Sequence, residues 1–158
     1  MDRWLKDLAV QYLRGSADRV LIPGVLGLSY AENTGAAFSL LSDSTAALSV
    51  ATALLLSAGV VALIAVRRKA LIYDICLPLI IAGGGGNLLD RVSRGYVVDY
   101  IQTLFMDFPI FNFADCLITC ACFAVVIYLI VQIATDAKKR RMPPEDSYYA
   151  EGNADGAS

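Results

Sequence analysis

Residues 44–66 read STAALSVATALLLSAGVVALIAV, an apolar run rich in Ala, Leu and Val that contains no charged side chain. A helix needs about 20 apolar residues to cross a hydrocarbon core of about 30 Å, and this run has that length. Arg67, Arg68 and Lys69 follow it directly. The run therefore predicts a transmembrane helix that ends at a basic cluster.

Two further apolar runs extend this pattern along the chain. Residues 71–89 hold Asp74 near their start and a run of glycines, 83–86, near their end. Glycine weakens a helix in water, but in a membrane it lets another helix approach closely. Residues 116–134 form the third run, and a basic segment at 138–141 follows it. We expect three full spans, at about 44–66, 71–89 and 116–134.

The basic clusters also predict an orientation. Lys and Arg gather on the cytoplasmic side of membrane proteins, and both clusters, 67–69 and 138–141, follow the end of a span. Residues 22–43 and 90–115 are then external. We expect residues 1–135 to form one membrane-embedded domain, with 136–158 as a polar, disordered tail on the cytoplasmic side.

The N-terminal residues 2–13 are helix-like, but they are too short to cross a bilayer. At 1.5 Å per residue they would span roughly 18 Å. Either they are half of a first transmembrane helix whose start is missing, or they form a helix at the membrane interface. The orientation requires their end to be outside.

Composition excludes several kinds of site. The chain has 158 residues, enough for one domain, and 57% of them are hydrophobic and 18% charged. The absence of His excludes His-based triads and most zinc sites. The four cysteines fit no zinc or redox spacing, so we interpret them as small apolar helix residues: Cys76, Cys116, Cys120 and Cys122.

Two aspartates lie where a carboxylate is costly, beside apolar stretches in the second external segment. Asp99 ends the sequence GYVVD, and Asp115 stands at the outer end of the third span. Two neighbouring carboxylates share one proton, so one is an acid and the other a base at neutral pH. Such a pair can activate water without metal, Ser or His. The alternative is structural: Asp99 caps a turn and Asp115 N-caps the third span.

Two other polar groups lie in or beside the external segments. Asn87 and Asp90 are three residues apart and share a helix face, and Arg91 could pair with Asp90 or reach a substrate carbonyl or phosphate. A salt bridge at the end of a helix is the alternative. Asn33 and Gly35 lie in a loop of small residues that could hold an extended peptide by main-chain bonds, or could form a plain turn.

Taken together, these segments resemble the signal peptidase II (lipoprotein signal peptidase) family. Four patterns of that family occur in order over about residues 2–134. They are Asp-x-x-x-Lys at 2–6, Asn-x-Gly-Ala-Ala-Phe at 33–38, Gly-Asn-x-x-Asp-Arg at 86–91 with Gly-Tyr-Val-Val-Asp at 95–99, and Phe-Asn-x-Ala-Asp at 111–115. The last three in this order are highly specific, whereas the first is short.

The resemblance implies a fold and a role for each matching residue. The fold is an all-α transmembrane bundle of the four-helix type, here with a truncated first helix, and a small extracytoplasmic β-rich loop region. Asp99 and Asp115 correspond to the catalytic dyad. The residues that shape the site or bind substrate are Asn33, Gly35, Asn87, Asp90, Arg91 and Asn112, supported by Asp2 and Lys6 in the first helix.

The resemblance also implies an aspartyl endopeptidase that needs no metal or other cofactor. The family removes the signal peptide of diacylglyceryl-modified prolipoproteins, before the lipidated Cys, at the outer face of the bacterial cytoplasmic membrane. We expect a monomer among membrane lipids, with no nucleic-acid partner. Family members have apolar residues before the Asp-x-x-x-Lys pair, which begins this chain, so we expect the start to be missing.

Two alternatives belong to other classes of protein. The first is a catalytically inactive relative or a non-enzymatic membrane assembly module, in which both aspartates are caps. The second is a transport component with Asp74, Asp90 and Asp99 in a cation path. Asp74 lies near the opposite face from the other two, which argues against a continuous path.

Overall fold

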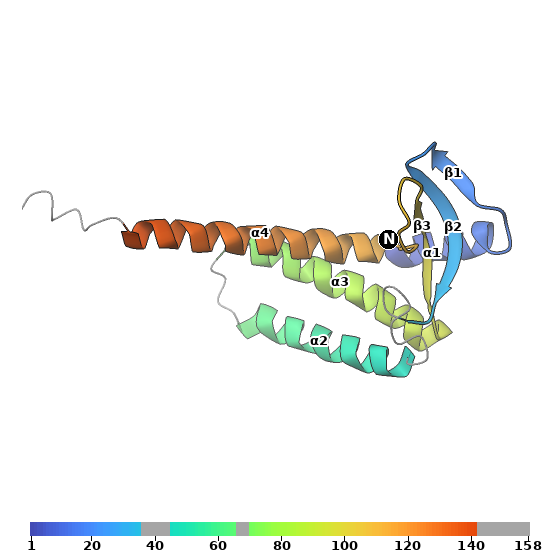
Figure 1. The fold of residues 1–158 in the computed structure, drawn as a ribbon. Coiled ribbons are helices and arrows are strands. Elements are labelled where there is room, and N and C mark those ends of the chain that lie inside the picture. The colour runs from blue at the N-terminus through green and yellow to red at the C-terminus, as the bar shows by residue number, and fades with distance from the viewer. Residues whose placement is uncertain (36–44, 66–69, 142–158) are drawn as a thin grey trace, which may run out of the picture. The chain divides into compact units, whose positions relative to one another are not determined.

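The structure is a computed structural model, and it describes residues 1–35, 45–65 and 70–141 (Figure 1). The chain divides into two compact units, Met1–Ala124 and Val125–Ser158, with the boundary inside the last helix. In order, the elements are α1 (Asp2–Leu13), β1 (Arg19–Ile22), β2 (Leu26–Asn33), α2 (Thr45–Ala65), α3 (Leu71–Arg94), β3 (Val97–Thr103) and α4 (Phe113–Arg141).

Three of the described helices are long and apolar enough to cross a membrane. They are Thr45–Ile64, Leu71–Arg94 and Phe113–Arg140, and α1 is not among them. Large apolar side chains on α2 and α4 are exposed, for example Leu55 at 74% and Ile133 at 68%. Such surfaces suit contact with lipid rather than water. The expected membrane helix bundle with a small sheet is confirmed.

The ends of two helices differ from the sequence expectation. The helix expected at 71–89 continues as α3 to Arg94, because no residue interrupts it before Gly95, which adopts a left-handed φ of 83°. The helix expected at 116–134 begins at Phe113 and continues to Arg141. Residues 136–141 are therefore helical instead of the disordered tail that we expected. Residues 142–158 lie outside the described part of the chain.

The first unit contains a three-stranded antiparallel sheet with the strand order β1-β2-β3. Ala31 pairs with Asp99 and Asn33 with Val97, so the end of β2 lies beside the start of β3. Side chains alternate along a strand. Val98 and Tyr100 consequently pack against α1 in a small core with Ala9 and Leu13, while Asp99 points to the opposite face.

A buried lysine connects α1 to α3. Lys6 is fully buried, and its Nζ lies 3.0 Å from Asp2 Oδ2 and 3.1 Å from Asp90 Oδ2. It also donates a hydrogen bond of 2.7 Å to Asn87 Oδ1. Asp90 is fully buried too, and Arg3 and Arg94 lie 3.1 and 3.5 Å from its Oδ1. One ammonium group thus holds three side chains of two helices.

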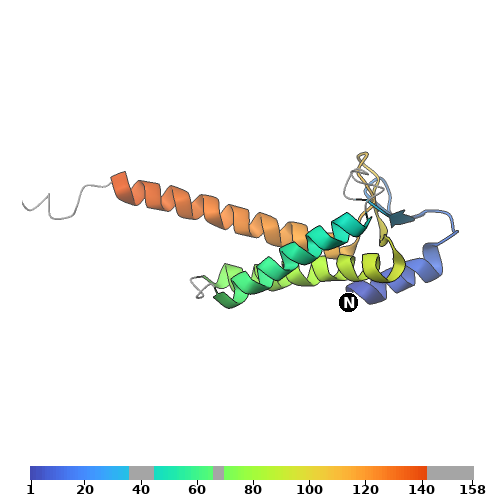
Figure 2. The same ribbon diagram turned by 90° about the horizontal axis from the view of Figure 1, so that it is seen from below.

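The glycine run of α3 lets three other helices approach, each at a different residue (Figures 1 and 2). A Cβ at Gly83 would lie 2.7 Å from the carbonyl oxygen of Ala114 in α4. A Cβ at Gly84 would lie 2.8 Å from Leu56 Cδ2 in α2, and one at Gly86 would lie 2.6 Å from Asp2 Oδ2 in α1. The glycines are close-contact points rather than flexible links.

We expect Gly83→Ala to destabilise the protein by about 1–3 kcal/mol, because its Cβ would collide with backbone that cannot rotate away. Gly85→Ala is the matched control, since a Cβ there meets nothing within 4 Å. Thermal unfolding in detergent measures the difference. Equal midpoints for the two variants would contradict the close contact.

We expect Lys6→Met to cost about 3–5 kcal/mol, because it leaves the buried Asp90 carboxylate without its ammonium partner. Adding Asp90→Asn should recover part of the loss. Arg14→Met is the control: it breaks an exposed pair with Glu32 (2.9 Å), which is worth about 1 kcal/mol or less. Denaturation in detergent of Lys6→Met, Asp90→Asn, the double variant and Arg14→Met tests this, and additive effects in the double variant would argue against direct coupling.

Candidate active site

The start of α4 is built by reciprocal hydrogen bonds between Asn112 and Asp115. Asn112 Oδ1 accepts from the Asp115 amide at 3.1 Å, and Asp115 Oδ2 accepts from the Asn112 amide at 3.0 Å. This is the geometry of a capping box, in which the N-cap and the third helical residue satisfy each other's amides. The N-cap is therefore Asn112, not Asp115 as the structural alternative supposed. The Asn-x-x-Asp spacing was a sequence sign of it.

Asp115 is surrounded by donors that stabilise its negative charge. Besides the Asn112 amide, Asn87 Nδ2 donates to its Oδ1 at 2.8 Å. Asp115 also lies in the first turn of α4, where the helix dipole favours an anion. Both of its side-chain oxygens thus face donors that neighbouring residues hold in place.

Asp99 is more deeply buried, with an exposure of 2%. Its Oδ1 accepts from Asn112 Nδ2 at 2.6 Å, and its Oδ2 accepts from Asn33 Nδ2 at 2.9 Å. Burial raises the pKa of Asp99 to about 6; the two amide donors oppose this shift, and the charge of Asp115 adds to it. Asn112 thus contacts both carboxylates, so the two groups belong to one site.

Each asparagine has its amide orientation fixed by a second contact. Asn33 Oδ1 accepts from the Gly35 amide at 3.0 Å, so its Nδ2 is directed to Asp99. Asn87 Oδ1 accepts from Lys6 at 2.7 Å and from Asn112 Nδ2 at 3.2 Å, so its Nδ2 is directed to Asp115. The donors therefore face the carboxylates before any substrate binds.

The other expected site residues divide into two groups. Asp90 does not line the cavity; it binds Lys6 and accepts a long hydrogen bond from the Val98 amide at 3.4 Å. Asp2 accepts from the Ala114 amide at 3.1 Å, at the start of α4. Both residues stabilise the site from outside the cavity lining. Arg91 lies at the cavity and donates from Nη2 to the Gly35 carbonyl at 3.3 Å.

A cavity of about 750 Å³ contains both carboxylates. The polar lining comes from β2, from the two residues that follow it and from α3, while Phe108 and Phe111 supply an apolar wall. Three further lining residues come from the first turns of α4, namely Cys116, Thr119 and Cys120. Helical spacing from Asp115 could have identified Thr119, which lies four residues further on, but not the other two. No sequence motif contains Phe108. Its position depends on how the loop after β3 folds back to the bridge between Phe111 and Ile101.

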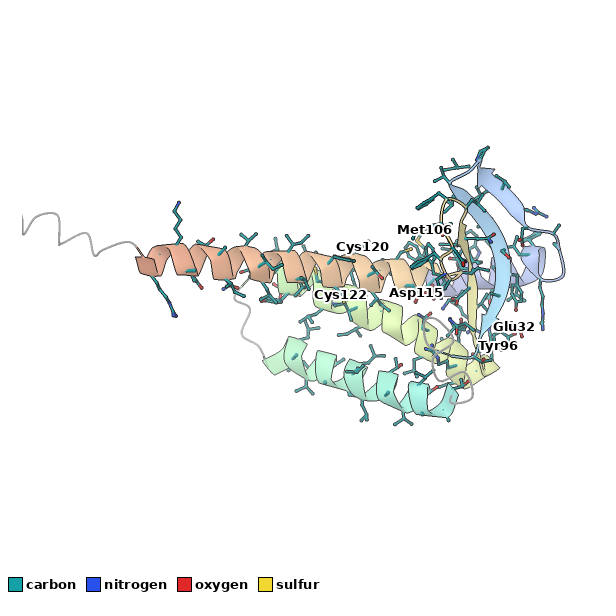
Figure 3. The ribbon with its side chains drawn as sticks, viewed as in Figure 1. Glu32, Tyr96, Met106, Asp115, Cys120 and Cys122 are labelled. Carbon is teal, nitrogen blue, oxygen red and sulfur yellow. The ribbon has the colours of Figure 1, made fainter. Side chains whose placement is uncertain are left out.

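The described residues contain no group of three or more His, Cys, Asp or Glu side chains arranged to hold a metal ion. The cavity holds two carboxyl groups that both accept from amide donors, and Asp99 is the more deeply buried of the two. Figure 3 shows Asp115 at the start of α4, near the sheet that carries Glu32. Such an arrangement can transfer protons to and from a water molecule and a carbonyl group.

Known proteins are similar to this chain in sequence and in fold. The family model for signal peptidase II matches residues 1–131. A lipoprotein signal peptidase of Enterococcus faecalis is 40% identical over 83% of this chain and 81% of its own length, and one of Streptococcus thermophilus is 39% identical over 82% and 84%.

Two solved structures, each described as a bacterial membrane enzyme, have the same fold. The first has a TM-score of 0.78 and 29% identity and covers 91% of this chain and 86% of its own. The second has a TM-score of 0.73 and 32% identity, with coverage of 81% and 84%. This chain belongs to the signal peptidase II family, and it is a multi-pass membrane peptidase.

Proposed function

We propose that this protein removes signal peptides from diacylglyceryl-modified prolipoproteins by cleaving before the lipidated Cys, with water activated by Asp99 and Asp115. The observation that carries the proposal is Asn112, whose side-chain amide donates to Asp99 and whose backbone amide donates to Asp115 at one cavity. The family membership supports the substrate class. The apolar wall of the cavity suits a substrate that arrives from the bilayer.

In this mechanism Asp99 begins as the acid and Asp115 as the base. Burial favours the neutral form of Asp99, whereas the helix terminus and two donors favour the anion at Asp115. Asp115 takes a proton from water as the water oxygen bonds to the scissile carbonyl carbon. Asp99 gives its proton to the carbonyl oxygen. When the C–N bond breaks, the dyad protonates the departing amine of Cys.

The substrate would lie extended beside the β2 loop. Gly35 and the guanidinium of Arg91 stand on the cavity rim, where they can hold main-chain groups of the peptide. The diacylglyceryl chains would remain among the lipid tails. Asn33, Asn87 and Asn112 keep the carboxylates oriented, and Lys6, Asp90 and Asp2 keep the asparagines and α4 in place.

The proposed location is the bacterial cytoplasmic membrane, with the site on the outer side. The dyad lies at the start of α4, and the basic residues 138–141 follow at its other end, which the positive-inside rule assigns to the cytoplasm. The dyad and the side chains that bind it all come from one chain, which is consistent with a monomer. Residues 142–158 would remain in the cytoplasm.

We expect Asp99→Asn and Asp115→Asn each to lower kcat by about 10²–10⁴-fold or more, because either change removes one proton-transfer group. Cleavage of a synthetic diacylglyceryl prolipoprotein peptide by purified protein provides the measurement. Asp107→Asn is the matched control, since Asp107 is exposed on the same external segment and does not line the cavity. If either dyad variant cleaves at the wild-type rate, the mechanism is wrong.

The pH profile tests the assignment of the acid. Because the acid must be protonated, kcat/KM should fall as pH rises through the Asp99 pKa of about 6. Asn33→Leu removes a donor that stabilises the Asp99 carboxylate, so the alkaline limb should move to higher pH. Asp107→Asn should leave the limb unchanged. A limb that stays in place in Asn33→Leu would assign the acid to another group.

A further inference from the structure

Two segments outside the helices carry large apolar side chains that are exposed. The first is β1 with the turn after it, residues 19–25, and the second is the loop after β3, residues 104–108. The Leu104 amide donates a hydrogen bond of 3.0 Å to the Val25 carbonyl, so the two segments lie side by side and form one apolar patch. Its members are exposed by 37–65% and are Val20, Leu21, Ile22, Val25, Leu104, Phe105, Met106 and Phe108.

The patch is exposed on both faces of β1, since all four residues of Arg19–Ile22 are exposed. Side chains alternate along a strand, so Leu21 points to the opposite side from Val20 and Ile22. A rigid protein partner would cover one of these faces, whereas a fluid layer of lipid can surround both. Pairing with a strand of another chain is also disfavoured, because β1 is short and Pro23, directly after it, has no amide to donate.

The patch is continuous with a part of the chain that spans the membrane. The loop that contains Phe105 and Phe108 leads directly into α4, a candidate membrane span that begins at Phe113. This short connection holds the patch close to the bilayer surface. Phe108 also lines the cavity, so the patch extends to the cavity wall.

The backbone and the charges of the two segments suit the region of the lipid headgroups. The Val25 amide donates to the Ile22 carbonyl at 3.0 Å, so part of the turn is paired within the chain. Such pairing lowers the cost of contact with lipid, where unpaired backbone groups are unfavourable. Arg19 and Asp107 are the only charged residues in the two segments, one of each sign, so the patch suits zwitterionic headgroups rather than a strongly anionic surface.

We propose that the apolar patch inserts into the bilayer surface beside the start of α4, among zwitterionic phospholipids, and anchors the sheet there. Interfacial elements of this kind reach about 5–10 Å into the boundary between headgroups and acyl chains. With the patch anchored, the cavity wall at Phe108 meets the bilayer directly. The inference rests on the exposed side chains and the membrane spans, so it stands or fails independently of peptide cleavage.

The test uses single-tryptophan variants of the full chain in phosphatidylcholine nanodiscs. Trp4 is the only tryptophan, so Trp4→Phe provides the background, and Phe105→Trp and Leu21→Trp each place a probe in the patch. Lipid with bromine on the acyl chains close to the headgroup should quench both probes by about half or more, because such quenching requires contact with lipid. Ser16→Trp is the matched control: Ser16 is exposed in the connection between α1 and β1, which lies farther from α4 than the turn after β1 does (Figure 1), and this probe should keep its emission.

Patch probes that keep their emission in brominated nanodiscs would overturn the proposal, and so would equal quenching of the Ser16→Trp probe. If the emission of the patch probes instead changes with the number of protein copies in each nanodisc, a second copy covers the patch and the lipid contact is wrong. Thermal unfolding identifies a misfolded variant. Because the two patch probes lie on separate segments, the other probe then decides the result.

Discussion

The fold depends on one buried ammonium group. Lys6 is fully buried in a small protein, and it is stable there because Asp2, Asp90 and Asn87 surround it at 2.7–3.1 Å. Its partners come from both α1 and α3, so the buried ammonium group keeps them all only if the two helices keep their register. The same network reaches the cavity, since Asn87 also donates to Asp115.

Hydrogen-bonded asparagine side chains then connect Lys6 to the two carboxylates of the cavity. Lys6 orients Asn87. The side-chain amide of Asn112 donates to Asn87 and Asp99, and its backbone amide donates to Asp115. Each amide uses its oxygen for support and its nitrogen for a carboxylate, so the donors do not need to reorganise during a reaction. Close contact between α3 and α4 at Gly83 allows this network to form, because a larger residue would separate Asn87 from Asp115.

The two carboxylates differ because their supports differ. Asp99 lies on a strand in the interior, where burial raises its pKa, whereas Asp115 lies at a helix start that stabilises its charge. The proposed acid and base thus differ in their surroundings before any substrate is present. The same helix start places Cys116 and Cys120 in the cavity lining.

The sequence predicts the membrane helices and most of the polar residues that meet at the cavity. Apolar length predicts a span, basic clusters predict its orientation, and the motifs around Asn33, Asp99 and Asp115 contain the polar residues. The contacts that these residues make appear only in the folded chain. Asp90 became a buried partner of Lys6, Asn112 rather than Asp115 became the N-cap, and Cys116 and Cys120 became cavity walls. These roles depend on contacts between distant segments, such as Asn33 with Asp99, and no local pattern carries that information.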